Sequence, residues 1–188
     1  MASQITNTNK WDTRTLTTMA LLAAIAALLS FIEGGNFGGF LNYDASFVPA
    51  VIAGFVFGPV PGFVVGIVSW LIHGLVKADL WGTIMNMACV AAYVIPSALI
   101  YRGNKTRTRA VVGLAVGSVC AVIVMILANL IVTPIYTGMS MAAVAALIVP
   151  LLLPFNVAKA VVNSVLAFVL YKSVSNMVRP VKEQVSGK

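Results

Sequence analysis

Long apolar segments alternate with short polar connections along the whole chain. The apolar runs predict six helices, at about residues 15–32, 47–57, 63–76, 82–101, 110–132 and 150–171. A helix needs about 20 apolar residues to cross a bilayer core, so the segment 47–57 is short for a crossing. We expect that helix to be tilted or to continue past its apparent end. The pattern predicts an all-α membrane protein: a compact bundle of six transmembrane helices, with residues 1–188 forming a single transmembrane domain.

Two connections contain enough glycine or proline to interrupt the helices. Residues 33–46 hold four glycines within six positions and two acids, Glu33 and Asp44, so this loop could fold over a site as a lid. Asp44 is equally well placed to cap the next helix. The sequence Phe57-Gly58-Pro59-Val60-Pro61-Gly62 predicts a turn between the second and third helices.

Composition places the chain among integral membrane proteins. It is 60% hydrophobic and only 9% charged, whereas a soluble domain has about 25% charged residues. Its two cysteines, Cys89 and Cys120, both fall in apolar segments, so we interpret them as small buried hydrophobes and expect no disulfide.

The net charge of +7 indicates topology instead of nucleic-acid binding, because nearly all the basic residues flank apolar runs. Six helices put both termini on one side, together with the connections at 58–62 and 102–109. The basic residues on that side are Lys10, Arg14, Arg102, Lys105, Arg107, Arg109, Lys172, Arg179, Lys182 and Lys188. The opposite side has Lys77 with three acids, so the positive-inside rule predicts that both termini are cytoplasmic.

The last apolar segment carries an unusual polar face. Asn156, Lys159 and Asn163 are spaced i, i+3 and i+7, which puts all three on one side of a helix. A lysine at the centre of a membrane helix costs at least about 2.5–3.5 kcal/mol, so it should face a cavity or a partner. We therefore predict that this face is the floor of a binding site.

Other polar residues are expected at the same depth. With the predicted topology, Asn86, Asn129, Asn156 and Lys159 all lie in the outer half of the bilayer, near the glycine-rich loop. Aromatic residues available to this pocket are Tyr43, Trp81, Tyr136 and Phe155. Such a lining suits a small, flat molecule with polar edges. The alternative is that each asparagine bonds to a neighbouring helix and has only a structural role.

No enzymatic motif is found in the sequence. The chain has one histidine and five acids, and it lacks the HExxH, GxSxG and Walker-type patterns. We expect no catalytic residues, no metal site and no cofactor.

His73 has no acid near it in sequence, which favours a packed histidine over a proton relay. A transporter that cannot hydrolyse ATP would need a partner.

The order of these motifs resembles the substrate-binding S components of energy-coupling factor (ECF) vitamin transporters. The matching stretches include Leu41–Ala50, Phe57–Gly62, Ala128–Tyr136 and Leu153–Lys159, within a similarity that runs from about residue 15 to 172. Within this family, the Phe-Gly-Pro-x-x-Gly and Pro-Phe-Asn-x-x-Lys elements are typical of the riboflavin-type branch. The resemblance implies a multi-pass protein of the bacterial plasma membrane that captures a vitamin from outside.

The resemblance also implies partners. The S component would dock onto a transmembrane coupling subunit carried by two ATPases, which alone would use ATP. The small residues spaced for close helix approach in the first helix are Ala20, Ala23, Ala24 and Ala27. Their alternative role is packing inside the bundle.

The resemblance assigns ligand contacts by position. Asn129, Asn156 and Lys159 match polar ligand-contacting residues of riboflavin-binding members, and residues 33–46 match the lid. The full set we expect to bind substrate is Asn42, Tyr43, Asp44, Asn86, Asn129, Tyr136, Asn156, Lys159 and Asn163.

Two positions depart from the riboflavin-type pattern. Ser69 and Trp70 occur where a lysine is frequent, and Ala160 replaces a usual glycine.

Riboflavin or a related flavin is the expected ligand. Pantothenate, pyridoxine and cobalamin are alternatives on the same framework. A stand-alone proton-driven carrier is the alternative from another class; inverted repeats and membrane acids would favour it, and neither is evident.

Overall fold

The computed structural model describes residues 12–178, with side chains up to residue 174. Lys10, Arg179, Lys182 and Lys188, which contribute to the charge prediction, lie outside this range. The described elements are α1 (Thr13–Phe31), β1 (Asn36–Phe37), β2 (Leu41–Asn42), α2 (Phe47–Phe57), α3 (Pro59–Lys77), α4 (Leu80–Gly103), α5 (Arg107–Thr137), α6 (Met141–Ala146), the π-helical turn η1 (Ile148–Leu152) and α7 (Leu153–Val178).

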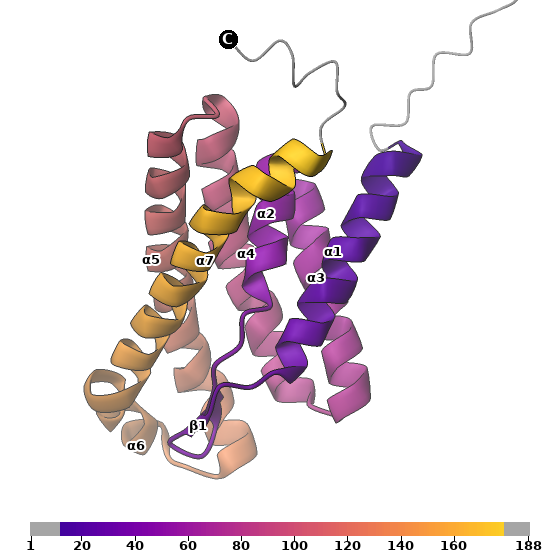
Figure 1. Ribbon diagram of the computed structural model, residues 1–188. Coiled ribbons are helices and arrows are strands. Elements are labelled where there is room, and N and C mark those ends of the chain that lie inside the picture. Colours follow the sequence, from indigo (N-terminus) through magenta and orange to yellow (C-terminus); the bar gives the residue numbers. More distant parts are fainter. Residues whose placement is uncertain (1–11, 179–188) are drawn as a thin grey trace, which may run out of the picture.

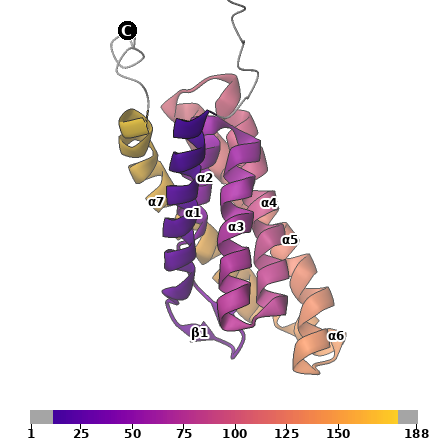
Figure 2. The ribbon, with the colours of Figure 1, turned by 90° about the vertical axis from the view of Figure 1, so that its right-hand side faces the viewer.

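The long helices run alternately up and down in one bundle (Figure 1). The first turn of α1 and the last turn of α7 lie at the same end, and the β1–β2 hairpin and α6 lie at the other (Figure 1). The view turned by 90° shows α1 and α3 side by side, with α4 and α5 behind α3 (Figure 2). α2 packs against α1, α3, α4 and α7, so it lies at the centre of the bundle.

Five helices within the described range are long and apolar enough to cross a membrane: α1, α3, α4, α5 and the continuous stretch Ile148–Val174. α2 has only 11 residues, which corresponds to about 16 Å of helix. Its residues from Phe47 to Phe55 are all buried, because neighbouring helices surround it. The second predicted helix, 47–57, is therefore present as a short internal helix.

The junction of α2 and α3 is tighter than the sequence predicts. α3 begins at Pro59, so the two prolines expected in a turn occupy its first turn, where a missing N–H costs nothing. The chain reverses at Gly58, whose φ of 109° suits glycine. A Cβ at Gly62 would lie 2.6 Å from the Cα of Gly54, so α3 needs glycine where it crosses α2.

Several helices also extend beyond their predicted limits. α5 continues to Thr137 through Pro134, where we expected the proline to end it. α4 begins at Leu80, because Asp79 accepts a hydrogen bond from the Gly82 amide at 2.9 Å and caps the helix. α7 begins at Leu153, after the η1 turn, and continues to Val178, past the predicted end at residue 171.

The glycine-rich loop contains a structure that an all-α prediction misses. β1 and β2 pair antiparallel, with Asn36 opposite Asn42. The three residues between the strands include Gly38 and Gly39, both with positive φ. The loop is thus a short hairpin at one end of the bundle.

Candidate ligand-binding site

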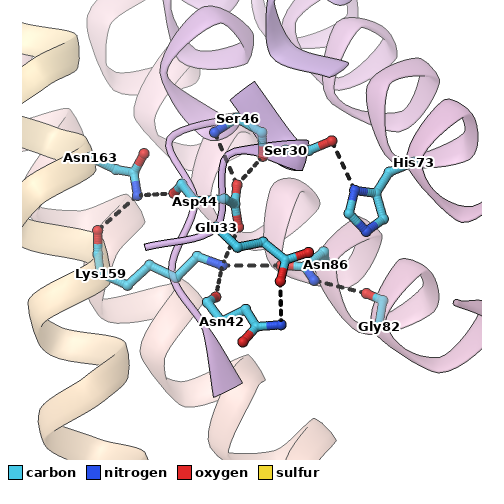
Figure 3. Close-up of polar contacts among 10 residues, drawn as sticks. All are labelled: Ser30, Glu33, Asn42, Asp44, Ser46, His73, Gly82, Asn86, Lys159 and Asn163. Atoms are coloured by element: carbon cyan, nitrogen blue, oxygen red, sulfur yellow. Dashed lines mark hydrogen bonds and ion pairs between the residues drawn. The ribbon is translucent and has the colours of Figure 1, made fainter. Parts of the chain in front are cut away.

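Lys159 of α7 lies at the centre of a buried polar cluster (Figure 3). Its residue is 8% exposed, and its Nζ lies 2.8 Å from Asp44 Oδ2. The same atom donates to Asn86 Oδ1 at 3.4 Å and to the Asn42 carbonyl at 3.5 Å. An ammonium has three N–H groups, so these acceptors use all of them. We predicted that Lys159 faces a cavity or a partner. In this conformation its ammonium is bound by partners from the loop and from α4.

Asp44 does not cap α2. Its Oδ1 accepts from the Ser46 amide at 3.0 Å and from the Ser46 hydroxyl, while Oδ2 faces Lys159 (Figure 3). Asp44 is 2% exposed, and its carboxylate bonds satisfy a charge that would otherwise be costly to bury. Its role is to hold the loop entering α2 against α7.

Asn163 strengthens the same attachment one turn farther along α7. Its Nδ2 donates to the Asp44 carbonyl at 3.2 Å and to the Lys159 carbonyl at 2.9 Å. Its Oδ1 is buried with no hydrogen-bond partner among the described residues. An orphaned buried acceptor costs free energy, and a ligand N–H or O–H or a water would satisfy it.

The loop has a second, more exposed attachment. Glu33 accepts from Asn42 Nδ2 at 2.9 Å and pairs with Lys77 of α3 at 3.3 Å. Both side chains of this ion pair are substantially exposed, so it contributes much less than the buried pair. Lys77 thus holds the loop to α3.

Below Lys159 is a small closed space, called here the inner cavity. It holds about 10 Å³, room for roughly one water molecule. Its lining residues are Phe47, Cys89, Tyr93, Ala121, Val122, Met125, Asn156, Lys159 and Ala160. The lysine Nζ lies 4.9 Å from the centre of the Phe47 ring, a cation–π distance. The inner cavity is apolar and aromatic, with its polar groups on one wall.

On the other side of Lys159 is an open space of about 420 Å³, called here the outer cleft. It lies between the hairpin loop and the start of α7, and is lined by Gly34, Phe37, Tyr43, Pro150, Leu151, Pro154, Phe155, Ala158, Lys159 and Val162. Burial, with a contribution from the charge of Asp44, raises the pKa of the Tyr43 phenol, so this group is a neutral hydrogen-bonding group at pH 7. Lys159 lines both spaces and forms part of the boundary between them.

Of the residues expected to bind substrate, Tyr43, Asn156 and Lys159 line these two spaces. Asn42, Asp44, Asn86 and Asn163 contact Lys159 or each other in the hydrogen-bonded cluster without lining either space. Asn129 and Tyr136 do not line either one. Asn129 is fully buried; its Nδ2 donates to the Met125 carbonyl and its Oδ1 accepts from Thr133. Tyr136 is 38% exposed near the end of α5.

The asparagines share a bonding pattern that the sequence did not indicate. Asn86, Asn129, Asn156 and Asn163 each donate to the carbonyl four residues earlier in their own helix. Two of them also bond to neighbouring elements, Asn86 to Lys159 of α7 and Asn163 to the loop at Asp44. Because one amide N–H is tied to the helix itself, the orientation of each side chain is fixed.

The first-helix alanines are divided between two faces. Ala23 and Ala27 are buried, at 6% and 5% exposure, whereas Ala20 and Ala24 are exposed. Positions 23 and 27 face the bundle, so Ala20 and Ala24 are the two alanines on the outer surface of α1. Docking of a partner on this helix stays a prediction. Both roles that we considered, packing and an outer surface, therefore occur on this helix.

Sequence reasoning missed several residues of the inner cavity, including Phe47, Tyr93 and Met125. Tyr93 bonds to Ser164 at 2.6 Å, and Ser164 to Ser118 at 3.0 Å, which joins α4, α7 and α5 at one edge of the cavity. Apolar and aromatic residues in apolar helices give no signal of which face they occupy. His73 is packed, as expected, with Nδ1 2.9 Å from Ser30 Oγ and its ring stacked on Phe31.

Comparison with known families gives a match over most of the chain. The family model for the substrate-specific component of ECF transporters matches residues 14–171. The chain is 30% identical over 181 residues to the riboflavin transporter RibU of Staphylococcus aureus (strain TCH60), which covers 91% of this chain and 95% of that protein. It is 25% identical over 169 residues to the riboflavin transporter FmnP of Bacillus subtilis (strain 168), covering 83% and 89%.

Solved structures agree with this match. The S component of a bacterial ECF transporter superposes with a TM-score of 0.76 at 29% identity, covering 89% of this chain and 98% of that one. ThiT from Listeria monocytogenes superposes with a TM-score of 0.67 at 17% identity, covering 88% and 97%. At that identity the second comparison shows a common fold alone.

Proposed function

The chain belongs to the family of ECF transporter substrate-specific components, and from this membership we propose that it is the riboflavin-binding subunit of an ECF-type importer. Its family is a class of integral membrane transport components, not of enzymes. The observation that carries the proposal is the near full-length similarity to two riboflavin transporters.

The chemistry of the site supports a flat ligand with polar edges. Phe47, Tyr93 and Met125 supply apolar and aromatic contacts, and Asn156 and Lys159 supply polar ones on one wall. A ring system offers faces for stacking and edges for hydrogen bonding. Asn163 Oδ1 adds a buried acceptor without a partner among residues 12–174.

The ligand cannot occupy the inner cavity as it stands, because about 10 Å³ admits only a water molecule. The outer cleft, at about 420 Å³, has the size of a small-molecule site. We infer that the ligand enters through the outer cleft and separates Asp44 from Lys159, which joins the two spaces. Closure of the loop would then restore the attachment over the bound ligand.

Individual roles follow from this path. Lys159 would meet a carbonyl or anionic group of the ligand, and Asn129 and Asn156 would bond to its edges once the helices adjust. Asn42, Tyr43 and Asp44 would act from the loop, while Asn86, Asn163 and Tyr136 complete the predicted set.

We further propose six membrane-embedded segments, with α2 as the short one and both termini in the cytoplasm. The described charges support this orientation. Arg14, Arg102, Lys105, Arg107, Arg109 and Lys172 lie at the end opposite the hairpin. The hairpin end has Lys77 with Glu33, Asp44 and Asp79, so the positive-inside rule puts the hairpin outside.

The family also implies an ECF module as partner. We propose a transmembrane coupling subunit and two ATPases, with ATP used only by the latter. Ala20 and Ala24, on the exposed side of α1, are the small residues that remain available for helix docking.

The test is the absorbance spectrum of the purified protein, followed by titration with riboflavin. We expect a co-purified flavin, seen as visible bands, or quenching of tryptophan fluorescence on titration. Trp70 is the expected reporter, because its ring centre lies 6.5 Å from that of Phe47, which lines the inner cavity. Trp70→Phe should then remove most of the quenching.

If the protein showed neither flavin absorbance nor quenching on titration, that result would contradict riboflavin as the ligand. Pantothenate, pyridoxine and cobalamin would then be titrated in the same way, since the framework admits other vitamins. Binding of one of these vitamins would leave the family assignment unchanged and would replace riboflavin as the proposed ligand.

A further inference from the structure

A third space lies at the end of the bundle opposite the hairpin, and we call it the basal cavity. It holds about 560 Å³, more than the outer cleft. It is bounded by the start of α1, the α2–α3 junction and the connection after α4. Its lining residues are Thr15, Gly54, Phe55, Val56, Phe57, Gly58, Pro59, Val60, Pro61, Arg102 and Lys105.

The basal cavity has apolar walls and two cations. Phe55 is buried and stacks on Tyr101 at 4.3 Å between ring centres, so this wall is held by the core. Arg102 and Lys105 are exposed, and the side chain of neither has an ion pair or hydrogen bond with another residue of the described range. Two unpaired cations beside an apolar surface favour an amphipathic anion.

Backbone groups add little to this site. Pro59 and Pro61 have no N–H, and the Gly62 amide donates to the Gly58 carbonyl. The start of α3 therefore offers one free amide at most, and an anion must be held by the two side chains. Asp12, at the same end, caps α1 by accepting from the Thr15 amide at 2.9 Å and does not line the cavity.

We propose that the basal cavity binds the headgroup of an anionic phospholipid from the cytoplasmic leaflet. The phosphodiester would lie between Arg102 and Lys105. The acyl chains would extend along exposed apolar side chains beside the opening, such as Val60 at 58% and Leu16 at 48% exposure. This inference rests on the membrane orientation proposed above, which places this end in the basic, cytoplasmic interface.

A lipid fits these features better than a soluble anion. A free phosphate would use the two cations but leave the apolar walls unoccupied. A lipid is also present at the membrane interface at high local concentration. Attraction by each cation near a membrane surface is about 1 kcal/mol, which is about fivefold in affinity for each residue.

The experiment compares two double variants of the full-length protein. Arg102→Gln with Lys105→Gln removes the cavity cations. Arg107→Gln with Arg109→Gln removes the same charge from the first turn of α5, outside the cavity lining. Delipidated protein in neutral detergent is titrated with phosphatidylglycerol or phosphatidylcholine, and bound lipid is counted by native mass spectrometry. Riboflavin titration of each variant reports separately on folding and on the proposed function.

We expect wild-type protein and the Arg107/Arg109 variant to retain phosphatidylglycerol in preference to phosphatidylcholine. The Arg102/Lys105 variant should bind phosphatidylglycerol at least about tenfold more weakly, with riboflavin binding unchanged. An equal loss in both variants, or no loss in either, would overturn the proposal. Competition by inorganic phosphate as strong as by lipid would also overturn it, in favour of a soluble-anion site. Unchanged lipid binding with lost assembly of the transporter would assign the cavity to a protein partner instead.

Discussion

At the residue scale, the site depends on how one buried charge is satisfied. Lys159 would cost several kcal/mol if it were buried without partners. Asp44, Asn86 and the Asn42 carbonyl surround its ammonium, and two of these come from the loop before α2. If Lys159 contacts the ligand as proposed, the same residue also holds the loop. This dual role makes closure of the loop and binding interdependent.

A double-mutant cycle tests that dual role. Lys159→Gln should weaken riboflavin binding more than tenfold, because it removes both a ligand contact and the loop attachment. Asp44→Asn should also weaken binding, since the loop loses its charged partner on α7. The double variant should be little worse than Lys159→Gln alone, because residues in direct contact couple by about 0.5–3 kcal/mol. Dissociation constants come from the tryptophan quenching titration.

Glu33→Gln and Lys77→Gln are the matched controls for this cycle. They remove an ion pair that attaches the same loop but is exposed to solvent. We expect each to change affinity by no more than about fivefold. Fully additive effects of the Lys159 and Asp44 substitutions would show that the two residues act on the ligand independently.

At the element scale, the close contact of α2 and α3 at Gly54 and Gly62 determines how the centre of the bundle is built. α2 is short and surrounded, so it can be held only where its neighbours approach closely. Gly54 and Gly62 permit that approach at the end of α2 opposite Asp44. The position of Phe47, at the start of α2 and in the wall of the inner cavity, depends on the same helix.

Gly62→Ala should therefore destabilise the protein. Its Cβ would lie 2.6–2.8 Å from backbone atoms of Gly54 and Ala50, which cannot move as a side chain can. Overpacking of this kind costs about 1–3 kcal/mol or more. The measurement is the thermal unfolding midpoint in detergent. Gly103→Ala, where a Cβ meets nothing within 4 Å, is the control and should leave the midpoint unchanged or slightly raised. Equal midpoints for the two variants would show that the crossing tolerates a wider spacing.

At the scale of the whole molecule, the charges of the described residues separate to the two ends of the bundle. Six basic residues, with Asp12, lie at the end opposite the hairpin. Outside the cluster around Lys159, the hairpin end has two acids, Glu33 and Asp79, and one lysine, Lys77. This separation predicts which end faces the cytoplasm.

Cysteine labelling tests that orientation. In a background with Cys89→Ala and Cys120→Ala, we introduce Asn36→Cys in the hairpin or Asn104→Cys after α4; both positions are exposed. A membrane-impermeant maleimide should label intact cells only at position 36, and position 104 only after permeabilisation. The reverse labelling would invert the topology and remove the cytoplasmic basis of the lipid proposal.

Much of this architecture was predictable from local sequence. Long apolar runs fix the membrane class and most helices, because a bilayer admits few other backbone structures. The spacing of Asn156, Lys159 and Asn163 places them on one face without knowledge of the fold. The hairpin was missed, because its strands have only two residues each. α5 extends past Pro134, where tertiary packing can outweigh the local preference of proline to end a helix.

The sequence by itself determined the membrane class, the helix order, the charge asymmetry and the presence of a buried lysine that needs partners. These follow from periodicity and from the cost of putting charge in hydrocarbon, both of which act along the chain. Only the tertiary structure decided that Asp44 is the partner of Lys159, that Ala23 and Ala27 face inward, and that Tyr93 and Met125 line the inner cavity. Those outcomes depend on which helices meet, and residues as far apart as 44 and 159 come into contact only through packing of the whole bundle.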